Sequence, residues 1–136
     1  MKSFRLPLVM IVILTLGLYS FESVYQNKDW VVPDSANKMK NPTDPDDEDD
    51  LDIGKTLYDK HCKSCHGKEG LGDGPKASEL DSDAGDFSSE EFQSQTDGAL
   101  LYKTTEGRDD MPSFAKKIAS EEDRWLVVNY MRTFAE

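Results

Sequence analysis

Two cysteines and a histidine stand close together near the middle of the chain, in the stretch Cys62-Lys63-Ser64-Cys65-His66. On a helix, residues three positions apart lie on the same face, so Cys62 and Cys65 can both reach one edge of a porphyrin and form thioether bonds there. His66 follows directly, and a neutral imidazole is an ordinary axial ligand of haem iron. The C-x-x-C-H pattern therefore predicts covalent attachment of one haem together with one ligand to its iron.

Other interpretations of the cysteine pair fit the sequence less well. A structural zinc site would need two more Cys or His ligands at a second spacing, but the chain has no further cysteine and its only other histidine, His61, lies beside Cys62. A thioredoxin-like pair follows a strand in an α/β pattern, and no such pattern precedes residue 62. A simple disulfide would leave His66 unexplained.

The N-terminus has the layout of an export signal. Lys2 and Arg5 precede an apolar run over residues 6–21. The run, about 16 residues long, is shorter than the ~20 residues that comfortably span a bilayer, and no clear cleavage site follows it. The sequence leaves open whether residues 1–21 are removed as a signal peptide or kept as a membrane anchor. Both outcomes predict a periplasmic protein, either soluble or tethered to the cytoplasmic membrane by its N-terminus.

The part of the chain after this leader is strongly acidic. The net charge of −11 disfavours binding to nucleic acid. Residues 22–50 contain three prolines, and residues 44–52 hold seven carboxylates, a composition that predicts an extended acidic linker. The apolar cluster Trp30-Val31-Val32 is the exception, either as a docking segment or as an isolated exposed cluster.

Three later segments predict helices. They span Leu51 to about Cys65, about Asp97 to Thr105, and the residues after Ser120. The expected caps are Asp49 or Asp50 for the first, Thr96 or Asp97 for the second, and Ser120 in a near capping box with Asp123 for the third. A glycine-rich loop over residues 67–75 ends the first helix. No strand alternation appears, so the predicted fold class is all-α, with a haem domain over residues 51–136.

A domain of about 85 residues has a thin hydrophobic core, and a covalently attached group can complete it. Three phenylalanines, Phe87, Phe92 and Phe114, are candidate walls of a haem pocket, although ordinary core packing explains each of them equally well.

These motifs together resemble class I cytochrome c. The resemblance rests on Gly54 and Tyr58 before the C-x-x-C-H motif, Gly67 and the glycine loop after it, then Met111-Pro112, and a final aliphatic-aromatic helix. It covers nearly all of residues 51–136. It implies a small all-α domain around one covalently attached haem c, with Gly54 and Tyr58 crossing the last helix at Val127 and Tyr130.

The resemblance also implies roles for two residues outside the motif. The carbonyl of Pro75 would accept a hydrogen bond from His66, and Met111 would be the second axial ligand of the iron. The chemistry of Met111 supports this independently, because a thioether is a soft, uncharged ligand suited to ferrous iron and the Gly107–Pro112 turn can bring it over a porphyrin. Met111 as mere packing is the alternative.

Ligation by His66 and Met111 would fill both axial positions and leave no place for a substrate on the iron. The sequence therefore predicts a single-electron carrier without catalytic residues, and not an enzyme. Two other functions stay open: a haem enzyme or ligand sensor in which Met111 is displaced, and a fixed haem subunit of a larger respiratory oxidoreductase.

Charge is unevenly distributed along the haem domain. Residues 52–76 carry five lysines and four carboxylates, whereas residues 77–111 carry two basic and ten acidic residues. Such an imbalance predicts a redox protein partner whose basic docking patch meets the acidic side, although an acidic surface that serves only solubility is an equal alternative.

Overall fold

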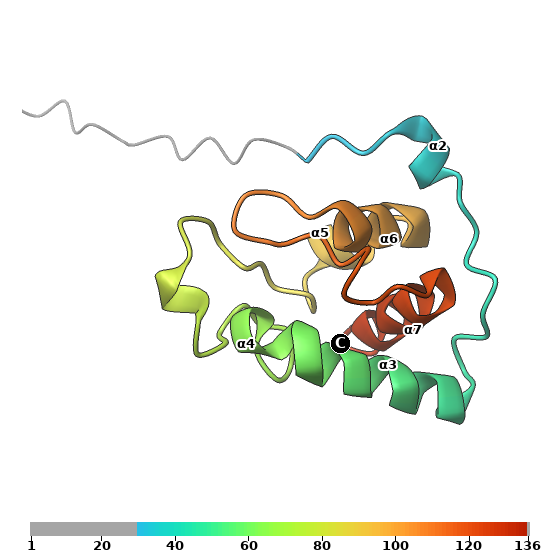
Figure 1. The fold of residues 1–136 in the computed structure, drawn as a ribbon, viewed down its shortest axis with the longest axis horizontal. Helices are drawn as coiled ribbons and strands as arrows, with labels where there is room; N and C mark the ends of the chain where they lie inside the picture. The colour runs from blue at the N-terminus through green and yellow to red at the C-terminus, as the bar shows by residue number, and fades with distance from the viewer. Residues whose placement is uncertain (1–29, 136) are drawn as a thin grey trace, which may run out of the picture. The chain divides into compact units, whose positions relative to one another are not determined.

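Three helices form most of the regular structure in the computed structural model, which describes residues 30–135 (Figure 1). They are α3 (Glu48–His61), α6 (Asp97–Glu106) and α7 (Glu121–Arg132). Four short helical segments connect or precede them: α2 (Asp34–Asn37), α4 (Lys63–His66), the 3₁₀ turn η2 (Ala77–Glu79) and α5 (Glu90–Gln93). Residues 30–135 contain no strand, only an isolated bridge between Arg108 and Met111. The predicted all-α class is confirmed.

The crossing of α3 and α7 is the most extensive helix contact in the domain. A Cβ atom at Gly54 would overlap the backbone carbonyl of Leu126 and lie 3.2 Å from Cβ of Tyr130, so only glycine allows this approach. The rings of Tyr58 and Tyr130 pack 5.3 Å apart beside it. The predicted crossing is therefore present, with Leu126 rather than Val127 opposite Gly54.

The helix starts follow the chemistry of their caps. Thr96 Oγ1 accepts a hydrogen bond from Ala99 N over 3.1 Å, and Ser120 Oγ accepts one from Asp123 N over 3.2 Å, as the sequence predicts. The prediction for α3 was wrong by a few residues, because its cap is Asp47 rather than Asp49 or Asp50. Carboxylates in a first helical turn are favoured by the helix dipole, so the later part of the acidic run, from Glu48 onward, becomes helix instead of staying solvated.

The segment before α3 differs from the predicted extended linker. Its short helix α2 packs against α6, and Ala36 is buried there. A Cβ at Gly98 would overlap the Ala36 carbonyl, so glycine at this position of α6 allows the close approach. Asn129 on α7 then accepts a hydrogen bond from Asn41 Nδ2 over 2.6 Å and donates one to Thr43 Oγ1 over 2.9 Å. Prolines block regular structure but do not prevent docking, so residues 33–47 lie along α6 and α7 as part of the domain (Figure 1).

The predicted signal peptide or membrane anchor, residues 1–21, lies outside the described residues. Over residues 30–135, none of the helices has the length and apolar character needed to cross a membrane.

Candidate functional site

The C-x-x-C-H stretch lies where α3 passes into α4. Cys65 N and His66 N both donate to the carbonyl of Cys62, over 3.1 and 3.0 Å, which closes a helical turn around the motif. Cys62 is buried and Cys65 partly buried, and neither forms a disulfide. Positions three apart on such a turn share a face, so the two thiols are placed for attachment to one flat group.

The glycine-rich loop folds back and packs against this turn. Gly74 N donates to the carbonyl of Cys65 over 3.1 Å, and Lys76 N donates to that of Ser64 over 2.8 Å. A Cβ at Gly74 would lie 2.5 Å from the Ser64 carbonyl oxygen, so the loop needs glycine to come this close. The loop thereby satisfies carbonyls at the end of α4 that would otherwise be unpaired.

The surroundings of His66 favour its neutral imidazole form. Its ring packs on Phe87 with centroids 4.5 Å apart. Burial lowers the pKa of His66, and the backbone of Ala84 only partly offsets that effect by favouring the protonated ring. The Nδ1 atom is buried and has no hydrogen-bond partner among residues 30–135. A neutral ring with an unpaired buried nitrogen fits the role of a metal ligand, because a neutral imidazole is the form that binds iron.

The hydrogen bond predicted between His66 and the carbonyl of Pro75 is not among those formed by the described residues. The role of Pro75 stays a prediction.

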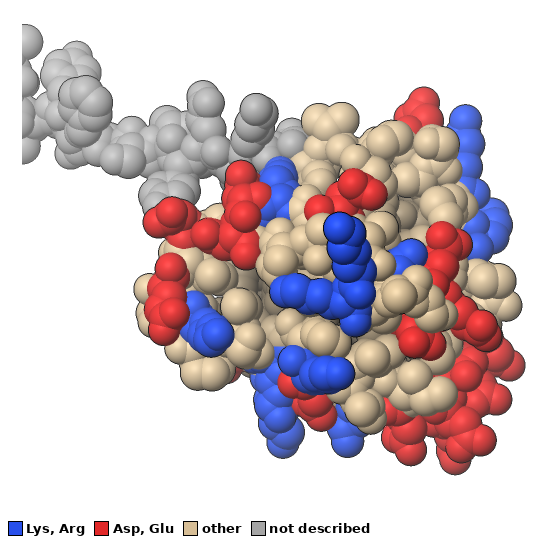
Figure 2. Space-filling model, in the orientation of Figure 1, with Lys and Arg blue, Asp and Glu red and all other residues tan. Residues whose placement is uncertain are grey.

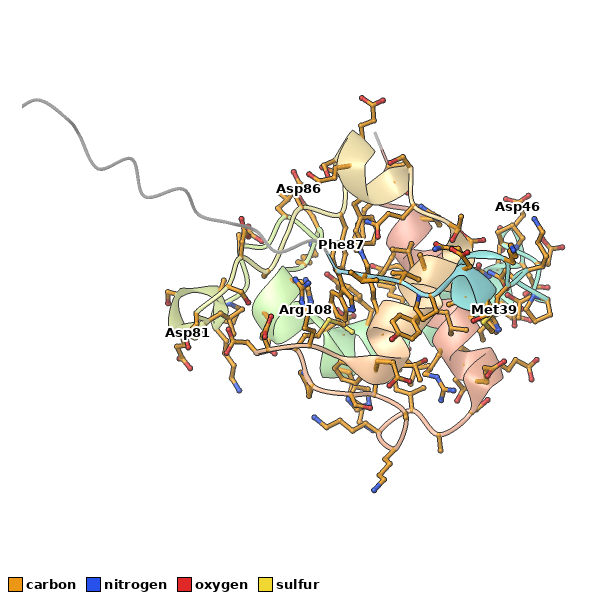
Figure 3. The ribbon with its side chains drawn as sticks, turned by 90° about the horizontal axis from the view of Figure 1, so that it is seen from above. Met39, Asp46, Asp81, Asp86, Phe87 and Arg108 are labelled. Carbon is orange, nitrogen blue, oxygen red and sulfur yellow. The ribbon has the colours of Figure 1, made fainter. Side chains whose placement is uncertain are left out.

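The predicted aromatic walls occupy two sides of the motif. Phe87 stacks on Phe92 with centroids 4.2 Å apart, next to His66, and its side chain points into the interior of the domain (Figure 3). Phe114 lies instead against His61, with ring centroids 6.0 Å apart. Phe87 and Phe92 therefore contribute to the surroundings of His66, and Phe114 to those of the neighbouring end of α3.

Met111 sits in a tightly held loop after α6. Its backbone pairs with Arg108 through hydrogen bonds of 2.8 and 2.9 Å, and Ser113 Oγ donates to the carbonyl of Thr105 over 2.6 Å. The partly buried Met111 packs against the same core cluster that contains Cys62 and Phe87. Met111 and Cys62 of the C-x-x-C-H stretch therefore belong to the same packed core, and the role of Met111 as an iron ligand stays a prediction.

The environment of Cys62 does not favour a reactive thiolate. Burial, with a smaller contribution from Cys65, raises the pKa of Cys62 to about 12, whereas reactive dithiol pairs have a lowered thiol pKa. In the described part of the chain, no group of three or more His, Cys, Asp and Glu residues could hold a metal ion. The donor set of two thiols and one imidazole matches an attached haem, and it matches neither a structural zinc site nor a thioredoxin-like redox pair.

The sequence model of the family described as Cytochrome c matches residues 51–135. The chain belongs to the cytochrome c family. Membership implies one covalently attached haem c, and the chain contains no cysteines besides Cys62 and Cys65 to hold it.

Two solved structures resemble this cytochrome c. One is the Kuenenia stuttgartiensis reducing HAO-like protein complex Kustc0457/Kustc0458, at 29% identity and a TM-score of 0.63, covering 82% of this chain and 53% of that chain. The other is the KustC0563 c-type cytochrome, at 27% identity and a TM-score of 0.52, covering 61% of this chain and 98% of that chain. No match was found among curated proteins. This chain therefore spans about half the length of the HAO-like complex chain, and their likeness extends to residues before position 51.

Sequence reasoning missed several polar residues that hold this cytochrome c together. Arg132 donates from Nε and Nη2 to Asp97 Oδ1 over 2.9 and 2.7 Å, and from Nη1 to the carbonyl of Gln93 over 2.8 Å, which joins α7 to the start of α6. Asn129 holds the segment before α3, as described above. The available signal was the position of Asn129 inside the apolar run of α7, because a polar side chain buried there needs partners.

We predict that Cys62→Ala and Cys65→Ala each leave the haem attached by a single thioether bond. Each variant then keeps one covalent link, whereas the double variant keeps none. The pyridine haemochrome spectrum, which shifts with the number of remaining vinyl groups, and the mass of the denatured chain check this. Equal spectra for wild type and both single variants would contradict it, and Ser64→Ala is the matched control.

Proposed function

We propose that this cytochrome c is a single-electron carrier, and not an enzyme, with His66 and Met111 as the two axial ligands. When bound, haem c supplies one-electron redox chemistry at its iron. The observation that carries the proposal is that Met111 packs against the core cluster that contains Cys62 of the C-x-x-C-H stretch. Two protein ligands leave no iron position for a substrate.

The surroundings of His66 and Met111 support a role in which the protein rearranges little during the reaction. His66 is buried against Phe87, and the loop of Met111 is joined to α6 by the hydrogen bond from Phe114 N to the carbonyl of Thr104, over 3.2 Å. Residues held in this way keep the same positions in two charge states. A small rearrangement favours electron transfer, because preorganised surroundings need not reorient when the charge changes.

The cellular site of this function is proposed from sequence alone. The cations and apolar run of residues 1–21 support export, so we place the protein in the periplasm, either free or held at the cytoplasmic membrane. There it would carry electrons between respiratory or other redox partners.

A fixed subunit of a larger oxidoreductase is the second candidate. The likeness to a chain of the Kuenenia stuttgartiensis HAO-like complex favours it. Gel filtration of the full-length protein, extracted from membranes in mild detergent, separates the two candidates by size.

We further propose a redox partner with a basic docking patch that meets the acidic side of the domain. Asp81 and Asp86 point outward from the segment before α5 (Figure 3). Positive charge gathers near the end of α3, where Lys117 lies 5.3 Å from the ring centroid of Phe114. The pKa of His61 next to it is lowered by burial first, and then by Lys60 and Lys117. In Figure 2, Lys and Arg occupy the centre of the face, and Asp and Glu its left edge and lower right.

Met111→Ala should lower the reduction potential by at least about 0.1 V, a fraction of the roughly 0.8 V that axial ligands span. Loss of the thioether favours ferric iron and opens a coordination position, while the haem stays covalently bound. Potentiometric titration and cyanide binding measure both effects. An unchanged potential with unchanged cyanide binding would show that Met111 is not a ligand; Met131→Ala is the control.

Electron transfer with the native partner should slow as ionic strength rises, because fields of this kind speed encounter by ~10 to 10³-fold at low salt. The double variant Glu79→Gln/Asp81→Asn should flatten this dependence in stopped-flow measurements. Both side chains are exposed, and both lie in the acidic segment, residues 77–111.

The matched control for this salt experiment is Glu48→Gln/Asp52→Asn. It removes the same charge at the start of α3 and should keep the salt dependence of the wild type. Equal slopes for both double variants would refute docking at the acidic segment.

A further inference from the structure

Asp110, the neighbour of Met111, reaches across to a segment 28 to 29 residues earlier in the chain. Its Oδ2 atom accepts hydrogen bonds from Asp81 N over 2.8 Å, from Ser82 N over 3.1 Å and from Ser82 Oγ over 3.2 Å. Three donors therefore converge on one carboxylate oxygen. Hydrogen bonds to an ionised acceptor are roughly twice as strong as neutral ones, which favours a defined position over a chance surface contact.

The segment that Asp110 contacts is itself joined to the C-x-x-C-H turn. Asp81 and Ser82 come directly after η2 and Leu80, and η2 packs against α4. Lys76, just before η2, donates from its backbone to the carbonyl of Ser64 over 2.8 Å. A short series of contacts thus links Asp110 to the turn that carries His66.

The other side of the Met111 loop is held by α6. Ser113 and Phe114 bind the carbonyls of Thr105 and Thr104. Met111 lies between this attachment and that of Asp110. Removal of either one leaves the loop fastened on a single side.

We propose that Asp110 is a positioning residue that keeps the Met111 loop fastened to the segment around Ser82, so that the thioether stays on the iron. The inference rests on the proposed ligation by Met111. Without the carboxylate, the loop opens more often, and exogenous ligands reach the iron during the openings.

The adjacent Asp109 provides a matched comparison. Its carboxylate pairs with Arg108 over 3.2 Å, and its side chain is 68% exposed. The hydrogen bonds to the segment around Ser82 are accepted by Asp110 instead. Its backbone has φ of 51°, a conformation that asparagine also adopts readily, so Asp109→Asn removes the charge without disturbing the loop.

The test uses the full-length holoprotein with Asp110→Ala, Ser82→Ala and Asp109→Asn. Asp110→Ala removes all three hydrogen bonds from Asp81 and Ser82. Cyanide binding to the ferric protein should then be at least about 10-fold faster, the factor expected for loss of a single hydrogen bond to a charged group. The far-red thioether-to-ferric charge-transfer band should also disappear at a lower guanidinium concentration. Ser82→Ala, which loses one donor, should show a smaller change in the same direction, and Asp109→Asn should match the wild type.

The outcomes separate this inference from the proposed function. If the wild type shows the band but Asp110→Ala behaves like Asp109→Asn, the role of Asp110 is refuted and the ligation by Met111 stands. If the wild type itself lacks the band, both proposals fail. Unchanged total helix content by far-UV circular dichroism in each variant shows that the helices stay folded and that the change lies outside them.

Discussion

Direct contact between the backbones of α3 and α7 at Gly54 is the constraint on which the site depends. With the two helices this close, Tyr58 is fully buried below α7, and its hydroxyl donates to the carbonyl of Gly67 over 2.9 Å. That bond holds the residue directly after His66. The position of the C-x-x-C-H turn therefore follows from a helix crossing two turns earlier in α3, and not from the motif alone.

The second half of the site depends on loops that have little regular structure of their own. The glycine-rich loop backs α4, and the Met111 loop is attached to α6. The segment before α3 packs against α6 where the Ala36 carbonyl meets Gly98, and it is hydrogen-bonded to Asn129 of α7. A domain this small buries little apolar surface, so these polar contacts and the attached haem c carry much of its organisation.

The sequence predicted the features that local chemistry determines. The C-x-x-C-H motif and the caps Thr96 and Ser120 depend on residue type at a given spacing, and the structure contains them. The approach of α3 to α7 at Gly54 was implied by the resemblance to class I cytochrome c, and the structure contains it too. The docking of residues 33–47 was missed, because composition reports charge and prolines but not the partner that Asn129 provides 86 residues away. Asp110 was missed for the same reason: nothing local distinguishes it from Asp109, and only the fold brings Ser82 to it.

The most direct test of an electron carrier with both axial positions filled is near-infrared magnetic circular dichroism of the oxidised full-length protein. The charge-transfer band of low-spin ferric haem reports the pair of axial ligands. Ligation by His66 and Met111 predicts a low-spin spectrum with the band at the energy of a histidine–thioether pair. A high-spin spectrum, or a low-spin band at the energy of two nitrogen ligands, would contradict the account.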